Sequence, residues 1–212
     1  MKTIITFLFS FFFLFSTLLT AQQKQYVFFL HNKFLESHSL TEKHPKYGVA
    51  EYTPILNKLK GKNTIVISEK RRDNTDPEVY ARKVITQIDS LQTKGILPQN
   101  ISIVGTSQGG YIAQYISYYA KNPDLKFVII GGSFKDDSLN KDLDFKLYGK
   151  ILSINEKSDD SHVALSTQKR YQNSHLKAFK EIEINTGMNH GFLFKALDAW
   201  LTPTKEWIQK KF

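Results

Sequence analysis

Six short apolar runs, separated by amphipathic segments, most constrain the fold of this chain. They are rich in β-branched and aromatic residues and span residues 26–30, 64–67, 101–104, 127–130, 150–154 and, more weakly, 181–184. Helical spacing of apolar residues marks residues 47–59, 77–91, 111–120 and 197–208, and Pro203 suggests a restart within the last. Strands that are apolar throughout are buried on both faces, and their alternation with helices is typical of parallel sheets. The sequence therefore predicts an α/β fold, a three-layer α/β/α sandwich with a mostly parallel sheet of about six strands.

The amino terminus has the plan of a secretory signal peptide. Met1-Lys2 is followed by an uncharged, phenylalanine-rich stretch from Thr3 to Ala21, and polar residues begin at Gln22. We expect residues 1–21 to be removed and the chain to be exported, periplasmic or secreted. The alternative is an uncleaved membrane anchor, because the stretch is nearly long enough to span a bilayer. After cleavage we expect no stable membrane insertion, and residues 22–212 contain no linker or repeat that would divide one domain into two.

The composition excludes several classes of site. The chain of 212 residues has no cysteine, so the fold must be held by its core, and thiol nucleophiles and thiolate metal ligands are absent. The net charge of +9 is spread over scattered lysines without a basic stripe of interleaved aromatics, and we therefore expect no nucleic-acid partner. Metal-ligand spacings, phosphate-binding loops and dinucleotide fingerprints are missing too, so no metal and no cofactor are expected.

A G-x-S-x-G motif, Gly105-Thr106-Ser107-Gln108-Gly109, stands between a predicted strand and a predicted helix. A serine at such a junction sits on a tight turn, where the flanking glycines leave room and the hydroxyl projects beyond the sheet. Its Oγ also lies near a helix N-terminus, whose N–H groups stabilise negative charge. By itself the motif fits a glycine-rich turn as well as a nucleophile.

Two further residue types used in acyl transfer follow later strands. Ligands of parallel α/β sheets bind beyond the carboxyl ends of the strands. His190 follows the last predicted strand, and Asp159 follows the fifth. A serine becomes a nucleophile when an imidazole takes its proton and a carboxylate orients that imidazole. We therefore predict Ser107, His190 and Asp159 as nucleophile, base and acid. The other histidines beyond the first strand's loop lie in polar segments and are expected at the surface: His38, His44, His162 and His175.

Alternatives remain open for the acid. Asp160 also follows the fifth strand, and Asp136 or Asp137 follows the fourth. Aspartates at such places commonly cap helices or lie in solvated turns. Asp159 is preferred because it is the nearer of its pair to the strand.

These residues together resemble the α/β-hydrolase superfamily in a minimal form without a lid. The resemblance covers nearly all of residues 22–212, with Gly105–Gly109 as the nucleophile elbow and the triad in the family's chain order. It implies an oxyanion hole made by the backbone N–H of Gln108 and an N–H of the loop after the first strand, here that of Lys33. The family's usual His-Gly is replaced by His31-Asn32, although asparagine tolerates left-handed backbone angles. His31 is expected to orient this loop.

Several side chains near the predicted triad are candidate substrate contacts. Phe34, Tyr111 and Phe192 could line an apolar acyl pocket, as could Phe194, although aromatic residues fit core packing equally well. Arg71, with Arg72 beside it, could meet a substrate carboxylate or phosphate, or could simply be solvated.

The sequence thus predicts an exported serine hydrolase, with an esterase acting on a small-molecule acyl substrate through an acyl-enzyme as the preferred interpretation. A peptidase, thioesterase or acyltransferase would use the same triad. A non-catalytic ligand-binding protein on the same fold is the alternative from another class.

Overall fold

The computed structural model describes residues 23–212, so the predicted signal peptide lies outside the described residues. Its main sheet has 6 strands in the order β4-β1-β5-β6-β7-β8, and every pairing in it is parallel. The strands are β1 (Gln25–Leu30), β4 (Thr64–Ile67), β5 (Ile101–Thr106), β6 (Lys126–Ile130), β7 (Tyr148–Glu156) and β8 (His175–Ile184). Each contains one of the predicted apolar runs, which confirms the parallel sheet.

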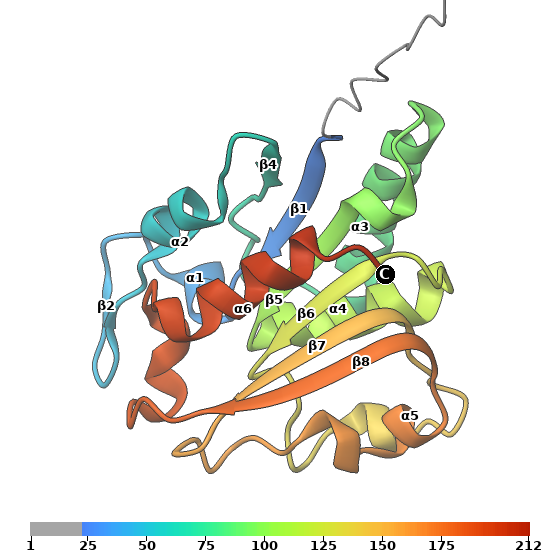
Figure 1. Cartoon of the computed structure of the whole chain (residues 1–212). Coiled ribbons are helices and arrows are strands. Elements are labelled where there is room, and N and C mark those ends of the chain that lie inside the picture. The colour runs from blue at the N-terminus through green and yellow to red at the C-terminus, as the bar shows by residue number, and fades with distance from the viewer. Residues whose placement is uncertain (1–22) are drawn as a thin grey trace, which may run out of the picture.

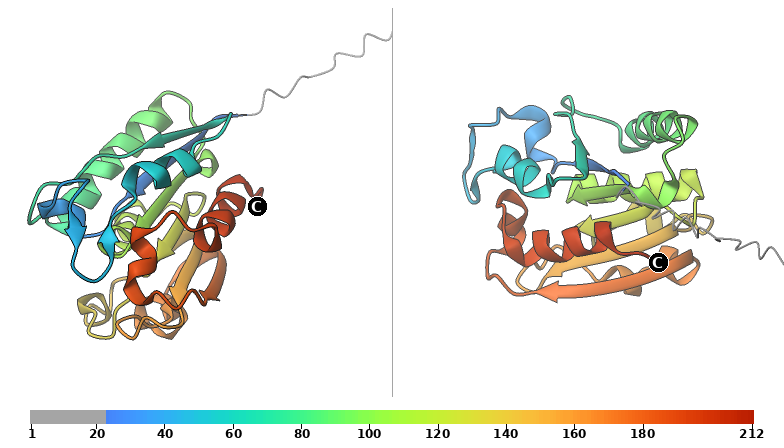
Figure 2. Two further views of the ribbon diagram at one scale, coloured as in Figure 1. Left: turned by 90° about the vertical axis from the view of Figure 1, so that its left-hand side faces the viewer. Right: turned by 45° about the horizontal axis from the view of Figure 1, so that its top comes forward.

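Helices cover both faces of this sheet. On one face, α3 (Pro77–Thr93), α4 (Gln108–Ala120) and the short α5 (Lys169–Gln172) enclose one apolar core. On the other face, α2 (Tyr52–Leu59) and α6 (Asp198–Gln209) enclose a second. In Figure 1, α6 crosses the front of the sheet while α4 lies behind it, and Figure 2 shows the layers from two other directions. The three-layer α/β/α architecture is therefore as predicted. Among the described residues, none of the helices is both long and apolar enough to cross a bilayer.

The segment after β1 differs from the prediction. It forms α1 (Phe34–Ser37) and a small antiparallel hairpin of β2 (Lys43–His44) and β3 (Gly48–Val49), so the helix expected from residue 47 begins only at Tyr52. Gly48 has a φ of +74°, a left-handed conformation that suits a hairpin rather than a helix. Val49, which fitted the helical spacing, belongs to β3.

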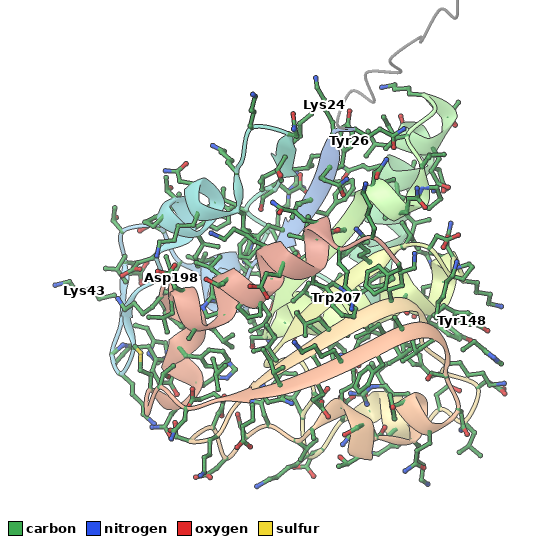
Figure 3. All side chains as sticks on the ribbon, viewed as in Figure 1. Lys24, Tyr26, Lys43, Tyr148, Asp198 and Trp207 are labelled. Atoms are coloured by element: carbon green, nitrogen blue, oxygen red, sulfur yellow. The ribbon has the colours of Figure 1, made fainter. Side chains whose placement is uncertain are left out.

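The last helix has the predicted extent but does not restart after Pro203. Helix α6 continues through Pro203 without a break. The Thr204 hydroxyl donates a hydrogen bond of 2.6 Å to the Trp200 carbonyl oxygen. Trp200 and Trp207 are both buried against the sheet, and Figure 3 shows Trp207 between α6 and the strands beneath it. Packing of this apolar face therefore outweighs the hydrogen bond that proline cannot make.

The parallel sheet places all its carboxyl ends along one edge. Loops that leave β1, β5, β7 and β8 therefore meet there, as expected for a ligand site in this class of fold. Ser107, Asp159 and His190 lie in or directly after these loops.

Candidate active site

Ser107 sits on a strained turn between β5 and α4. Its φ of 51° and ψ of −118° lie in a region that residues other than glycine rarely adopt. The Ser107 N–H donates to the Ile130 carbonyl oxygen at 2.8 Å, and the Ser107 carbonyl oxygen accepts from the Tyr111 N–H at 3.0 Å. The backbone on both sides of the turn is therefore tied to β6 and to the first turn of α4.

Glycines on each side of the serine allow this turn to close. A Cβ on Gly105 would lie 2.2 Å from the Gly109 carbonyl oxygen, and a Cβ on Gly109 would lie 1.9 Å from the Leu30 carbonyl oxygen. Both distances are far inside van der Waals contact. Glycine is thus needed at both positions for α4 to approach β5 and the end of β1 so closely.

A chain of hydrogen bonds joins the three predicted catalytic residues. Ser107 Oγ lies 3.0 Å from His190 Nε2, and His190 Nδ1 lies 2.7 Å from Asp159 Oδ2. The His190 side chain keeps 22% of its surface exposed, whereas Asp159 keeps 3%. His190 comes from the 3₁₀ segment Asn189–Phe194, which directly follows the loop after β8. Asp159 comes from the turn after β7, where its N–H donates to the Glu156 carbonyl oxygen at 3.0 Å. The structure brings all three residues together in the geometry of nucleophile, base and orienting acid.

The carboxyl group of Asp159 is held in its ionised form. Its burial alone would raise the pKa, but hydrogen bonds from His162, His190 and Ser161 outweigh burial and hold the pKa well below its usual range. Oδ1 accepts from the Ser161 hydroxyl at 2.6 Å and from the Ser161 N–H at 3.2 Å. The second oxygen is thereby left to the two histidines.

The other candidate acids lie in different surroundings. Asp160 and Asp136 are exposed. Asp137 is buried, but it forms an ion pair of 2.6 Å with Arg170 and accepts the Leu139 N–H at 3.0 Å. In the structure, Asp159 is the aspartate that contacts His190.

His162 is a residue of the site that we missed. The expectation that it lies at the surface is wrong, because its side chain is 2% exposed and its Nδ1 is 2.6 Å from Asp159 Oδ2. Its ring also stacks on that of His190, with centroids 4.8 Å apart and planes 14° apart. The polar neighbours of His162 in sequence suggested solvent. Its position three residues after Asp159 was the one signal that the two side chains could meet.

The loop after β1 lies against the start of α4, as an oxyanion hole requires. The contact of Gly109 with the Leu30 and His31 carbonyl oxygens brings Gln108, the first residue of α4, beside this loop. Lys33 directly precedes α1. Asn32 is not among the described residues with a positive φ; instead its Oδ1 accepts the Leu35 N–H at 3.4 Å.

A buried network of hydrogen bonds and one ion pair holds the loop after β1 in place. The Arg71 guanidinium donates to the His31 carbonyl oxygen at 2.6 Å and pairs with Glu36 at 2.8 Å. The Arg71 N–H donates to His31 Nε2 at 2.8 Å, while His31 Nδ1 donates to the Asn32 carbonyl oxygen at 2.6 Å. Burial, with the positive charge of Arg71, lowers the pKa of His31 to about 3. His31 is therefore neutral and fixed in one tautomer, in a position to orient the loop.

Four of the predicted substrate contacts divide into two pairs. Arg71 and Phe192 are buried, with 2% and 0% of their surface exposed, because Arg71 serves the loop network and Phe192 belongs to the core. In this structure neither offers surface to a substrate, and Arg71 is not solvated. Phe34, in α1, and Tyr111, in α4, are half-buried. The rings of Phe34 and Phe194 are in contact, with centroids 5.4 Å apart. The Tyr111 hydroxyl lies 2.7 Å from Ser138 Oγ.

Asp159, His162 and His190 are also residue types that hold transition metals, and their candidate ligand atoms lie within 4.8 Å of one another. However, both Nδ1 atoms lie within 2.7 Å of the same carboxylate oxygen. Ligands around a tetrahedral ion stand farther apart, roughly 3.3 Å for bonds near 2.0 Å. The spacing is that of hydrogen bonds, and it fits the serine relay rather than a metal centre.

Comparison with known proteins relates this chain to others through its fold. No protein-family model matches it, and neither does any curated sequence. Among solved structures, it is similar to SOBER1 of Arabidopsis thaliana, with a TM-score of 0.56 and 15% identity over 88% of this chain and 98% of that one. It is also similar to the RedJ thioesterase of the prodiginine pathway in Streptomyces coelicolor (TM-score 0.54, 11% identity, 86% and 89% covered). A third is a structure described as an arylesterase (TM-score 0.53, 16% identity, 87% and 74% covered). At such low identity these likenesses show the fold alone.

Proposed function

We propose that this chain, which has the α/β-hydrolase fold, is a serine hydrolase that cleaves a small-molecule acyl ester through an acyl-enzyme intermediate. The observation that carries the proposal is the relay from Ser107 through His190 to Asp159, with distances of 3.0 and 2.7 Å. The strained, glycine-flanked turn at Ser107 also supports the proposal. Backbone strain of this kind is costly, and it is found mainly at functional sites, where the surrounding structure enforces it.

The relay supports a two-stage reaction. Ser107 Oγ attacks the carbonyl carbon while His190 Nε2 takes its proton, and Asp159 stabilises the resulting imidazolium. The oxyanion of the tetrahedral intermediate accepts hydrogen bonds from the Gln108 and Lys33 N–H groups. His190 then protonates the leaving alkoxide. A water molecule, deprotonated by His190, releases the acid and restores Ser107.

The first test uses Ser107→Ala with Ser90→Ala as a control, since Ser90 is exposed on α3. We expect hydrolysis of a p-nitrophenyl acetate substrate to fall at least about 10³-fold in Ser107→Ala and to be unchanged in the control. A fluorophosphonate probe should label the unmodified protein and the control, but not Ser107→Ala. Full hydrolysis by a folded Ser107→Ala protein would refute the mechanism. Binding of esters without turnover by the unmodified protein would favour a ligand-binding role instead.

A series of substrates would show which class of acyl compound the protein cleaves. One similar structure is a thioesterase and another is described as an arylesterase, so oxygen esters and thioesters of matched acyl length form the two arms. We expect oxygen esters of short and medium chains to give the higher kcat/KM. A preference for thioesters or for peptide bonds would keep the triad but change the substrate class.

We also propose that the protein is exported and that residues 1–21 are removed, which rests on the sequence pattern of this segment. Mass spectrometry of the protein from a secreting host should show an amino terminus at Gln22. Retention of the full-length chain in the membrane fraction would point to an uncleaved anchor.

A further inference from the structure

His162 lies between two oxygen atoms that can only accept hydrogen bonds. Its Nδ1 is 2.6 Å from Asp159 Oδ2, and its Nε2 forms a short hydrogen bond with the Gly131 carbonyl oxygen. Gly131 follows β6, and its own N–H donates to the Ile154 carbonyl oxygen at 2.9 Å, which fixes the position of this acceptor. The Gly131 acceptor is thus held by the sheet, and Asp159 is held by the turn after β7.

Two acceptors require a proton on each ring nitrogen. A neutral imidazole carries one N–H, so one of its lone pairs would face an oxygen lone pair at hydrogen-bond distance. The Ser161 hydroxyl, 3.1 Å from His162 Nδ1, does not remove this conflict, because it already donates to Asp159 Oδ1. The hydrogen bonds are all satisfied when His162 is an imidazolium.

The charges around His162 favour a cation. His162 and Asp159 border a hollow of about 390 Å³ whose other charged lining residues are Glu156, Lys157, Glu181 and Glu183. The His162 ring contacts Phe134, from the loop after β6, and His190, each at a centroid distance of 4.8 Å. Tyr47, in the β2–β3 hairpin, faces the ring of His190 with a centroid distance of 6.4 Å. With Asp159 included, these neighbours carry four carboxylates and one lysine.

We propose that His162 is a buried imidazolium that shares the carboxylate of Asp159 with His190 and keeps His190 unprotonated, and so able to act as a base, down to a lower pH. The charge of His162, the first half of this proposal, follows from its two hydrogen-bond acceptors and from the carboxylates around it. The second half rests on the proposed function, because it concerns His190 as the base for Ser107. His162 is in this sense a positioning residue, since it acts through Asp159 and His190.

The stacked rings give the physical reason. Protonation of His190 would place a second positive charge 4.8 Å from the first, ring centre to ring centre. Such a pair of like charges disfavours the second proton, even though Asp159 attracts it. The positive charge of His162 therefore opposes protonation of the resting His190.

The first experiment measures the protonation state directly and needs no activity. In ¹⁵N-labelled Ser107→Ala protein, the two ring nitrogens of His162 should both show imidazolium chemical shifts at pH 7.5, assigned by their loss in His162→Asn. The same result is expected in the unmodified protein. A neutral tautomer of His162 at that pH would overturn the proposal, whether or not the protein proves to be an esterase.

The second experiment measures the consequence for catalysis. In His162→Asn, the acid limb of the kcat/KM profile should move to higher pH by about one to two units, because the neighbouring positive charge is gone. His162→Gln provides a second neutral variant if the first does not fold, and His175→Asn, at an exposed position, should leave the profile unchanged. A lower kcat with an unmoved acid limb in folded variants would overturn the pH-setting role. Complete inactivity of the unmodified protein would instead contradict the proposed function and leave the NMR result standing.

Discussion

At the scale of single residues, Ser107 combines an unfavourable backbone with a tightly packed setting. A non-glycine residue with a φ of 51° and ψ of −118° costs on the order of 1–3 kcal/mol. The hydrogen bonds to Ile130 and Tyr111 hold it there, and so do the glycines that let neighbouring backbone approach. The reactive hydroxyl is thus positioned by its neighbours rather than by its own conformational preference.

Gly109→Ala tests this setting. The added methyl group would lie 1.9 Å from the Leu30 carbonyl oxygen, so α4 must move away from the end of β1. We expect the free energy of unfolding to fall by about 1–3 kcal/mol and ester hydrolysis to fall with it. Urea unfolding and initial rates measure the two effects.

Gly61→Ala is the matched control. Gly61 is exposed, and its nearest neighbour to an added Cβ is Thr64 Oγ1 at 3.4 Å, an ordinary contact. The stability and the activity of the Gly61→Ala protein should be nearly unchanged. A Gly109→Ala protein that behaves like Gly61→Ala would contradict the packing argument.

At the scale of elements, the loop after β1 depends on a buried ion pair from the loop after β4. The side chains of Arg71 and Glu36 keep 0% and 2% of their surface exposed, and Arg71 also binds the His31 carbonyl oxygen. Removing one partner leaves the other charge buried and unpaired.

Arg71→Met should therefore lower the free energy of unfolding by about 3–5 kcal/mol. Arg72→Met should change it by less than about 0.5 kcal/mol, because Arg72 is an exposed neighbour. The double variant Glu36→Gln/Arg71→Met should recover part of the loss, since no unpaired charge remains. Chemical denaturation of all three proteins makes the comparison, and equal losses in Arg71→Met and Arg72→Met would rule out the buried pair as the cause.

The sequence predicted these elements where local pattern determines structure. The apolar runs of β1, β5 and β6 and the glycines around Ser107 carry their own signal, because burial and tight turns restrict residue type. Arg71 and His162 carry no such signal. Polar neighbours suggested solvent for both, and only the folded chain brings Arg71 to Glu36 and His162 to Asp159. Partners distant in sequence are not visible in residue pattern, and the spacing of three between Asp159 and His162 did not by itself identify them as a pair.

At the scale of the whole molecule, stability should depend on pH through His31. Its pKa is lowered from 6.5 to about 3 in the folded protein. Between these two pH values the unfolded chain is protonated at His31, whereas the folded protein is not. The free energy of unfolding should consequently fall by up to about 1.4 kcal/mol for each pH unit between 6 and 4. Asp159 adds a loss in the same direction only below about pH 4, where the unfolded chain protonates its carboxyl group.

His31→Gln should flatten this dependence between pH 6 and 4, although its stability at neutral pH is lower. His175→Gln, at an exposed position, should retain the slope. Urea denaturation at half-unit intervals of pH is the measurement, and an unchanged slope in a folded His31→Gln protein would assign the effect to other groups.

The order of the strands bears on how the chain can acquire its structure. Among the described strands β1 is synthesised first, yet its sheet neighbours are β4 and β5, and its partners in β5 begin only at Ile101. Until that point is reached, β1 has no second parallel neighbour and its apolar side chains have no closed core. Contacts of this sequence separation form slowly. We therefore expect the growing chain to lack a closed sheet until β5 has been synthesised, so that most of the core of the molecule assembles late.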